Sequence, residues 1–376
     1  MSERKKVEES SSFSCPSCGG KMVFTPETQT MKCPYCGTEK KVDFAYTTPE
    51  EYDVFGARQN TDWGDTMRVI KCPSCGAETV LDQHTTATFC AFCGSPHVLE
   101  EQGSAGIAPE SMIPFSIGKE QAVTAFRAWI KKRHFAPNGL KKIAALGELA
   151  GVYLPTYTYD SDATADYVGQ EGHWYYVTVP VQVRDSNGRS HTEMRRERRT
   201  DWRPTAGQVG KYFDDVPVPG SRRLNQRLLS TVYPYDTSKL ISYQKEYLSG
   251  FASEKPAVSV QEGWSTAREQ IENELKDMAR RDILSRADEA RVTAVSANHR
   301  DVRYKLVLWP AWLSAFNFKD KKFNVLINGQ TGKVGGESPK SAWKIALFVL
   351  FLLAVIGVIV YLLMEGDGAQ YISYYY

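Results

Sequence analysis

The stretch that decides the fold lies near the N-terminus, where Phe13–Val42 reads FSCPSCGGKMVFTPETQTMKCPYCGTEKKV. A second stretch, Ile70–Leu99, reads IKCPSCGAETVLDQHTTATFCAFCGSPHVL and has the same C-x2-C-x14-C-x2-C spacing. Duplication of one module is the simplest interpretation of two such stretches. Together they contain all eight cysteines of the 376-residue chain, which are Cys15, Cys18, Cys33, Cys36, Cys72, Cys75, Cys90 and Cys93.

Each CxxC pair has the sequence of a metal-binding knuckle. Such a turn places two sulfurs side by side, and two turns complete the tetrahedral set of four thiolates that zinc prefers. Gly follows the second cysteine of every pair. It tolerates a positive φ there and lets backbone N–H groups point at the thiolates. We therefore predict two β zinc ribbons, over residues 14–43 and 69–103, each holding one structural zinc ion.

Other uses of the cysteines fit the sequence less well. The polar start MSERKKVEESSSFS lacks the apolar core of a signal peptide, so we expect this part of the chain in the cytoplasm, where disulfides are rare. A catalytic zinc keeps an open coordination position, whereas these sets are closed. An iron site of the rubredoxin type is the alternative that stays open. His84 and His97 exceed the four ligands of the second ribbon, and we interpret them as surface residues.

An apolar run lies at the other end of the chain. Ile345–Leu363 reads IALFVLFLLAVIGVIVYLL and contains no charged residue. At about 1.5 Å per residue it matches the hydrocarbon core of a bilayer, roughly 30 Å thick. A buried core helix is disfavoured because the run has no polar face. We predict one transmembrane helix over residues 343–364, with Trp343 and Tyr361 at the two interfaces.

The charges that flank this run predict its orientation. Lys333, Lys340 and Lys344 precede it, whereas only Glu365 and Asp367 follow it. The positive-inside rule then places the bulk of the chain in the cytoplasm and the short tail, residues 365–376, outside. The prediction is a single-pass protein of the cell membrane.

Residues 104–338 have the pattern of an α+β domain with an antiparallel sheet. Helical periodicity covers Lys119–His134, and a capping box at Thr266–Glu269 is expected to open a second helix. We predict strands over Tyr153–Tyr159, Tyr175–Val183, Arg189–Arg199 (after an Asn187-Gly188 turn), Lys305–Phe318 and Phe323–Asn328. Residues 1–13 are predicted to be disordered and residues 44–68 to be a spacer. The fold class is thus multidomain: two small β ribbons, an α+β middle domain and one C-terminal transmembrane helix.

No catalytic constellation is visible. Gly329–Val334 resembles a phosphate loop but lacks its spacing and a Ser or Thr after the lysine, so we interpret it as a glycine-rich hairpin end. Gly263–Ala267 resembles a nucleophile elbow but lacks the last glycine. Ser265 or Thr266 is expected to be a helix N-cap instead. We predict that the chain is not an enzyme, with no catalytic residue and no small-molecule substrate.

The densest basic run is Arg195–Arg203, which contains five arginines and Trp202. Acidic residues interrupt it, so the first interpretation is a solvated strand edge protected by charge. Contact with anionic lipid headgroups and contact with nucleic acid are the alternatives. The net charge of +2 and pI of about 8.0 are low for a nucleic-acid-binding domain, for which a pI above about 9 is typical.

The doubled ribbons, the aromatic middle region that ends in NGQTGKV (Asn328–Val334) and the terminal apolar run together resemble a bacterial family. Its members are TFIIB-type zinc-ribbon membrane proteins, often encoded beside PspA-like and SPFH-domain (virion-core-like) proteins. The resemblance implies a membrane-anchored adaptor that recruits such a soluble partner to the cytoplasmic face during envelope stress. By motif match, it also implies that the eight cysteines are the metal ligands.

A helicase label sometimes given to such proteins does not carry over, because the chain has no Walker motif. A membrane-tethered nucleic-acid-binding protein is the alternative function, since zinc ribbons often serve that role.

Overall fold

The computed structural model describes residues 14–42, 49–56, 59–63, 67–82, 90–93, 95, 99–101, 106–137, 149–184, 188–224, 226–318, 321–336 and 340–368. The predictions for residues 1–13, for His84 and His97, and for the tail after residue 368 lie outside this range.

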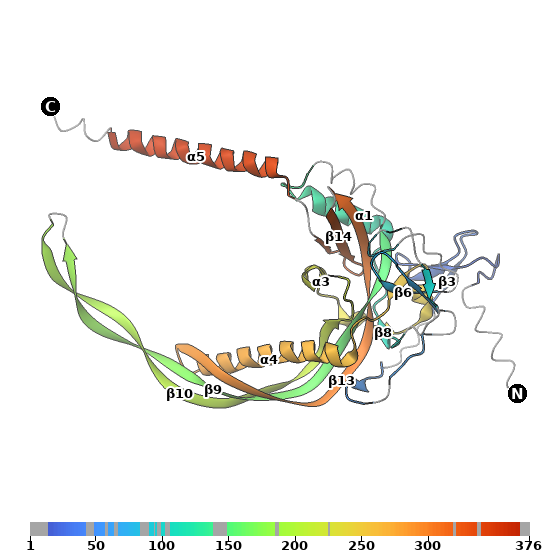
Figure 1. The fold of residues 1–376 in the computed structure, drawn as a ribbon, viewed down its shortest axis with the longest axis horizontal. Helices are drawn as coiled ribbons and strands as arrows, with labels where there is room; N and C mark the ends of the chain where they lie inside the picture. The colour runs from blue at the N-terminus through green and yellow to red at the C-terminus, as the bar shows by residue number, and fades with distance from the viewer. Residues whose placement is uncertain are drawn as a thin grey trace.

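Three long antiparallel strands form the body of the molecule, and Figure 1 shows them curving together into an arc. They are β9 (Ala150–Arg184), β10 (Ser190–Pro219) and β13 (Glu289–Phe318). β9 lies between the other two. The middle of the chain is therefore organised around one strand of 35 residues.

The separate strands expected at Tyr153–Tyr159 and Tyr175–Val183 are one continuous strand. Every residue from 152 to 161 is buried, which is the pattern of a strand covered on both faces. Beyond that point Ala163, Ala165 and Tyr167 alternate with more exposed polar residues. The strand therefore continues between the two predicted segments, because one of its faces still packs against another element.

That partner is helix α4 (Val260–Leu284), which lies in the concave side of the arc (Figure 1). Its buried residues recur at helical spacing and pack on the odd-numbered residues of β9. They are Val260, Gly263, Trp264, Ala267, Ile271, Leu275, Ala279 and Ile283. Burial of this stripe, rather than helix propensity, holds α4 in place.

The predicted start of α4 is wrong. Ser259 is the N-cap, and its hydroxyl accepts a hydrogen bond from the Glu262 N–H. Ser265, expected near the cap, instead lies inside the helix and donates to the Gln261 carbonyl at 3.1 Å. Ser259–Glu262 also has the pattern of a capping box and lies seven residues upstream of Thr266–Glu269. The helix continues through Gly263, which is buried against Tyr159.

Short elements close the wide end of the sheet. β8 (Ser111–Met112) pairs parallel with β13, and β12 (Ala252–Glu254) pairs parallel with β9. The sheet is therefore mixed, which corrects the predicted antiparallel sheet. The remaining elements here are α1 (Lys119–Lys131), α3 (Gln226–Val232), η2 (Thr237–Lys239), β11 (Ile241–Ser242), η3 (Lys245–Leu248), β14 (Lys321–Asn328) and β15 (Val334–Gly336).

The expected hairpin end at Gly329–Val334 joins β14 to β15. The Asn328 side chain accepts hydrogen bonds from the backbone N–H groups of Gln330 and Thr331, at 2.8 and 2.9 Å. Gly332 has a φ of 74°, which this turn requires. The backbone N–H groups of Gln330 and Thr331 are thus hydrogen-bonded within the turn itself.

The N-terminal third is built into the body more closely than expected. β1 (Val23–Thr25), β2 (Thr30–Lys32) and β3 (Glu39–Lys41) form a separate three-stranded sheet. β5 (Met67–Lys71), β6 (Glu78–Asp82) and β7 (Leu99–Glu101) instead extend the large sheet. β4 (Tyr52–Asp53), in the predicted spacer, pairs with β13. The described strands of the second ribbon and of the spacer are therefore parts of the large sheet.

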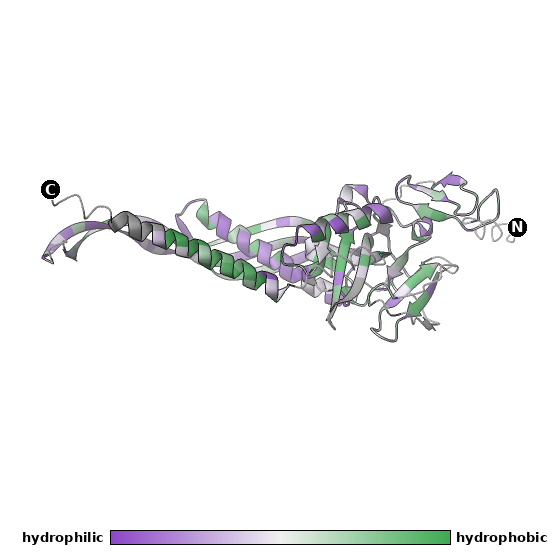
Figure 2. Ribbon diagram, turned by 90° about the horizontal axis from the view of Figure 1, so that it is seen from above, coloured by the Kyte–Doolittle hydropathy of each residue, from purple (hydrophilic) through white to green (hydrophobic). Residues whose placement is uncertain are grey.

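Helix α5 (Ala342–Gly368) projects from the body, and Figure 2 shows it as hydrophobic over most of its length. Its segment Ala342–Tyr361 is long and apolar enough to cross a membrane, and none of it is buried inside the protein. Its first turns touch the body, where the rings of Phe348 and Phe135 lie 5.5 Å apart. The helix runs on to Gly368, so the first residues of the predicted tail belong to it.

Gly263 offers a test of the packing of α4. A Cβ atom at this position would lie 2.1 Å from the Tyr159 hydroxyl, which donates to the Val260 carbonyl at 2.7 Å. Gly263→Ala should therefore destabilise the protein by about 1–2 kcal/mol in chemical unfolding, although alanine favours a helix by nearly 1 kcal/mol.

The added variant Tyr159→Phe removes the obstructing oxygen and should recover part of that loss in the double mutant. A Gly263→Ala protein as stable as the parent would show that this contact does not constrain the helix.

Candidate metal centres

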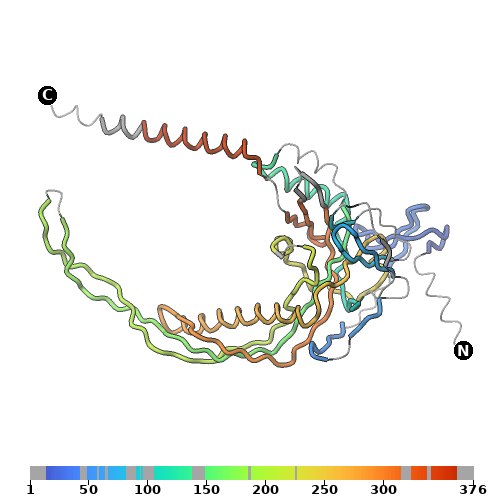
Figure 3. The backbone as a smooth tube through the Cα atoms, viewed as in Figure 1, coloured from blue at the N-terminus to red at the C-terminus, as the bar shows by residue number. Residues whose placement is uncertain are grey.

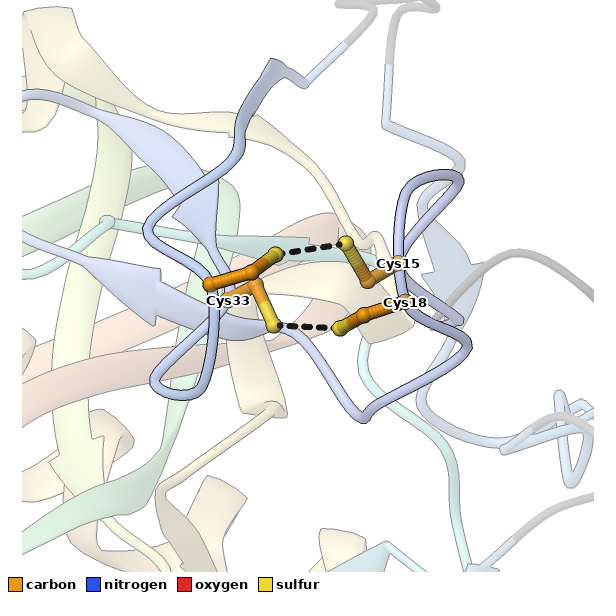
Figure 4. A group of neighbouring side chains, drawn as sticks. Cys15, Cys18 and Cys33 are labelled. Atoms are coloured by element: carbon orange, nitrogen blue, oxygen red, sulfur yellow. Dashed lines mark hydrogen bonds between the residues drawn. The ribbon is translucent and has the colours of Figure 1, made fainter.

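The first ribbon brings its four cysteines into one group. Cys15 Sγ lies 3.4 Å from Cys36 Sγ, and Cys18 Sγ lies 3.5 Å from Cys33 Sγ. All four sulfurs lie within 4.8 Å of one another. Figure 4 shows the side chains of Cys15, Cys18 and Cys33 turned toward a common centre.

The second ribbon repeats this arrangement at the junction with the large sheet. Cys72 Sγ lies 3.6 Å from Cys93 Sγ, and Cys75 Sγ lies 3.7 Å from Cys90 Sγ. Four sulfurs at about 2.3 Å from a tetrahedral ion are separated by roughly 3.8 Å, whereas a disulfide needs about 2.05 Å. Both groups thus have the spacing of a metal tetrahedron, and the structure contains two groups of four cysteines that could hold metal ions.

The backbone of the knuckles explains their sequence. In each one the N–H of the first cysteine donates to the carbonyl five residues later, as in Cys15 to Gly20 at 2.7 Å and Cys72 to Ala77 at 2.9 Å. In the three knuckles where the structure describes the glycine after the second cysteine, its φ is positive: 70° at Gly19, 76° at Gly37 and 68° at Gly76. A side chain there would be strained, so the C-x-x-C-G pattern follows from the turn.

Hydrogen bonds in the knuckles lower the pKa of the first cysteine of each group, whereas other cysteines of the same groups have a raised pKa. Burial raises the pKa of Cys15. Hydrogen bonds, first those from the backbone of Cys18 and Ser17, outweigh this effect and lower the pKa to about 6. At Cys72 burial is outweighed in the same way by hydrogen bonds, first those from the backbone of Cys75 and Ser74, and the pKa is about 7. Hydrogen bonds with neighbouring thiols outweigh a backbone bond at Cys18 and raise its pKa to about 12. A bound cation would displace the protons that such thiols hold, and proton release would accompany metal binding.

The first ribbon docks on the body through aromatic packing. The rings of Phe24 and Tyr247 meet edge to face, with centroids 4.7 Å apart. The Phe24 N–H donates to the Ser249 carbonyl at 3.1 Å, and the buried Ser249 hydroxyl donates to the Met22 carbonyl at 2.8 Å. The segment after η3 thus satisfies backbone groups of the ribbon that would otherwise be buried without partners.

The second ribbon joins the body through strand pairing. β12 lies between β9 and β6, with Ser253 opposite both Tyr153 and Val80. At the rim, Lys255 and Glu78 form an ion pair at 2.9 Å. Glu254 is buried in this joint, where the Ser221 hydroxyl donates to it at 2.7 Å. Burial raises the pKa of Glu254 to about 7.

One group of carboxylates was missed by sequence analysis. Oxygen atoms of Asp160, Asp214 and Asp215 lie within 4.8 Å of one another. Lys305 enters this group and pairs with Asp215 at 2.8 Å and with Glu51 at 2.9 Å. Burial raises the pKa of Asp160 to about 7. The three carboxylates come from different strands and from a β-bulge, so no sequence spacing signals them.

The arginines of the run Arg195–Arg203 lie on β10, an edge strand. Two of them stack on rings of β9: Arg196 on Tyr176 at 3.9 Å and Arg198 on Trp174 at 4.0 Å. Figure 3 shows this part of the hairpin projecting far from the ribbons. Metal groups and arginines are therefore separate features of the molecule.

Comparison with known proteins finds one informative relative. The chain is 29% identical to a Bacillus subtilis (strain 168) protein that bears the name "Uncharacterized protein YdjG", over 89% of this chain and 92% of that protein. No family model matches the chain, and no solved structure matches it. The likeness therefore covers most of the chain and says nothing of activity.

Metal content tests the two groups separately. Cys18→Ser combined with Cys36→Ser should lower the bound metal from two ions per chain to one, measured by elemental analysis. The first ribbon should unfold locally, because structural zinc supplies about 10–16 kcal/mol of binding that is also folding energy. Two ions in the double mutant would contradict the ligand assignment.

Glu254 gives a test of the joint at β12. Its folded pKa of about 7 lies above its ordinary value of 4.5, so its favourable contribution is complete below pH 4.5 and is lost as pH rises through 7. Glu254→Gln cannot ionise. Its unfolding free energy relative to the parent should therefore rise between pH 5 and 8, by up to about 3 kcal/mol.

The control for this measurement is Glu269→Gln, at an exposed position on α4. If both variants follow the parent across the pH range, Glu254 is not protonated in the folded joint.

Proposed function

We propose that the chain is a membrane-anchored adaptor whose ribbons hold one zinc ion each. The apolar helix α5 fixes it in the cell membrane with the body in the cytoplasm, and the ribbons recruit a soluble protein. Thiolate donors in closed sets of four favour zinc over the harder cations and favour a structural role over a catalytic one.

The placement of the ribbons supports this proposal. Figures 1 and 2 agree that the ribbons lie at one end of the molecule and that α5 runs toward the other. A partner bound at the ribbons is then held away from the bilayer. The lysines that precede α5 favour the same orientation, with the body on the cytoplasmic side.

A difference between the two ribbons carries the proposal. Tyr35 and Phe92 occupy the same position in the second knuckle of each ribbon, directly before its last cysteine. Phe92 is only 6% exposed and packs into the body, whereas Tyr35 is 81% exposed. The first ribbon therefore presents outward the side chain that the second uses for docking. An exposed tyrosine on a rigid knuckle is the kind of anchor that dominates protein interfaces.

The partner class follows from the resemblance: an SPFH-domain or PspA-like protein. The arginines of β10 are far from the ribbons and partly stacked on rings, so they do not extend a nucleic-acid surface from the knuckles. A membrane-tethered nucleic-acid binder is therefore the second candidate.

Co-purification tests the adaptor function. The full-length protein and its Tyr35→Ala variant are purified from their own membranes in mild detergent, and bound protein and nucleic acid are identified. We expect an SPFH-domain or PspA-like protein with the parent and at least about tenfold less with Tyr35→Ala, the effect of losing one interface anchor.

The control is Tyr212→Ala, which removes a tyrosine that is 54% exposed on β10, and both variants should retain two zinc ions. Nuclease-sensitive nucleic acid lost with Tyr35 would favour the second candidate. Equal partner recovery from all three proteins would contradict the role of the first ribbon.

A further inference from the structure

The far part of the β9–β10 hairpin stands alone. β13 begins at Glu289, opposite Gly172, and α4 ends at Leu284 in the same region. Beyond these points β10 continues from Arg203 back to Ser190 with β9 on one side. Among the described residues no other strand pairs with β10, and Figure 3 shows this part of the hairpin clear of the body. Half of the backbone N–H and C=O groups of Ser190–Arg203 therefore point outward without a strand partner.

The side chains on one face of this segment alternate strictly in charge. Every second residue carries a charge opposite to that of the one before it: Glu193, Arg195, Glu197, Arg199, Asp201 and Arg203. All six are exposed. Arg199 meets Glu197 at 3.4 Å and Arg203 meets Asp201 at 2.9 Å within the strand, as exposed pairs that add little stability.

Natural edge strands usually prevent pairing by like charges, proline or bulges. The rest of this sheet uses such devices. Pro204 ends the segment, a bulge between Phe213 and Val216 disrupts β10 further on, and Pro180 interrupts the outer edge of β9. A row of like charges would repel a second copy of itself. A row that alternates in sign can pair with an antiparallel copy in the registers in which each charge meets its opposite, although a shift of two residues would bring like charges together.

We propose that two copies of the chain pair edge to edge through Ser190–Arg203 of β10, antiparallel, about a two-fold axis at Arg198. The two hairpins then form one four-stranded ribbon. In this register the facing residues of the two copies are Glu193 with Arg203, Arg195 with Asp201, and Glu197 with Arg199, each pair occurring twice. Directly opposed charges of unlike sign stabilise an antiparallel pair, and like charges destabilise it.

The opposite face of the segment is compatible with this register. Met194, which is 63% exposed, lies opposite Trp202 of the second copy, and a thioether beside an aromatic ring is a favourable contact. Arg198 lies on the axis, but its guanidinium is drawn onto Trp174 at 4.0 Å. The charges of β10 disfavour entry of this strand into the hydrocarbon, whereas residues 174–183 of β9 contain no charged side chain. This inference concerns self-association and does not depend on the ribbons.

Charge-reversal variants of the full-length, zinc-loaded protein in mild detergent test the proposal. An acidic-row variant carries Arg195→Glu, Arg199→Glu and Arg203→Glu, and a basic-row variant carries Glu193→Lys, Glu197→Lys and Asp201→Lys. By analytical ultracentrifugation we expect the parent to be a dimer and each variant alone to associate at least about tenfold more weakly. An equal mixture of the two variants should form heterodimers, detected through a tag on one of them.

The control carries Arg268→Glu, Arg280→Glu and Arg281→Glu on the exposed side of α4, which changes the net charge as the acidic row does. It should dimerise like the parent. Two zinc ions per chain in every variant establish that the ribbons are folded, and an unchanged circular dichroism spectrum establishes the same for the sheet. A monomeric parent at all concentrations overturns the proposal, as does a pair of variants that dimerise alone as well as the parent does.

Discussion

Strand β9 hydrogen-bonds to β13 along one edge and to β10 and β12 along the other, and the larger parts of the molecule are attached through these pairings. Its first ten or so residues are buried on both faces. A buried backbone must have all its N–H and C=O groups paired, so a strand in this position needs partners on both edges. β12, of only three residues, supplies one of them where β10 has already turned away.

Buried tyrosines connect this strand to the helix above it. The hydroxyl of Tyr157 donates to the Val258 carbonyl at 3.1 Å, and that of Tyr159 donates to the Val260 carbonyl at 2.7 Å. A buried hydroxyl without a partner is costly, so these two carbonyls stabilise the positions of the Tyr157 and Tyr159 rings. The start of α4 is in this way placed by the sheet, and the helix then covers the concave face as far as its apolar stripe extends.

The features whose chemistry is local could be predicted from the sequence. The eight cysteines and the apolar run of α5 are recognisable because ligand spacing and hydrophobic length are properties of short segments. The features that depend on partners distant in the chain could not be predicted. The three residues of β12 have no periodicity, so the fusion of the second ribbon with the large sheet could not be predicted. The cluster at Asp160 combines strands remote in the chain, and the cap at Ser259 competed with an equally good pattern at Thr266.

The two ribbons are attached to the sheet by different means. The first packs on η3 and the residue after it, and the second pairs with β12, which in turn pairs with β9. Metal in the ribbons should therefore order the base of the sheet as well as the cysteine loops. Hydrogen–deuterium exchange of the full-length protein, with metal and after chelation, tests this most directly. The account predicts that residues 247–254 lose protection together with the ribbons while the distal hairpin is unchanged. Loss of protection confined to the cysteine loops would contradict it.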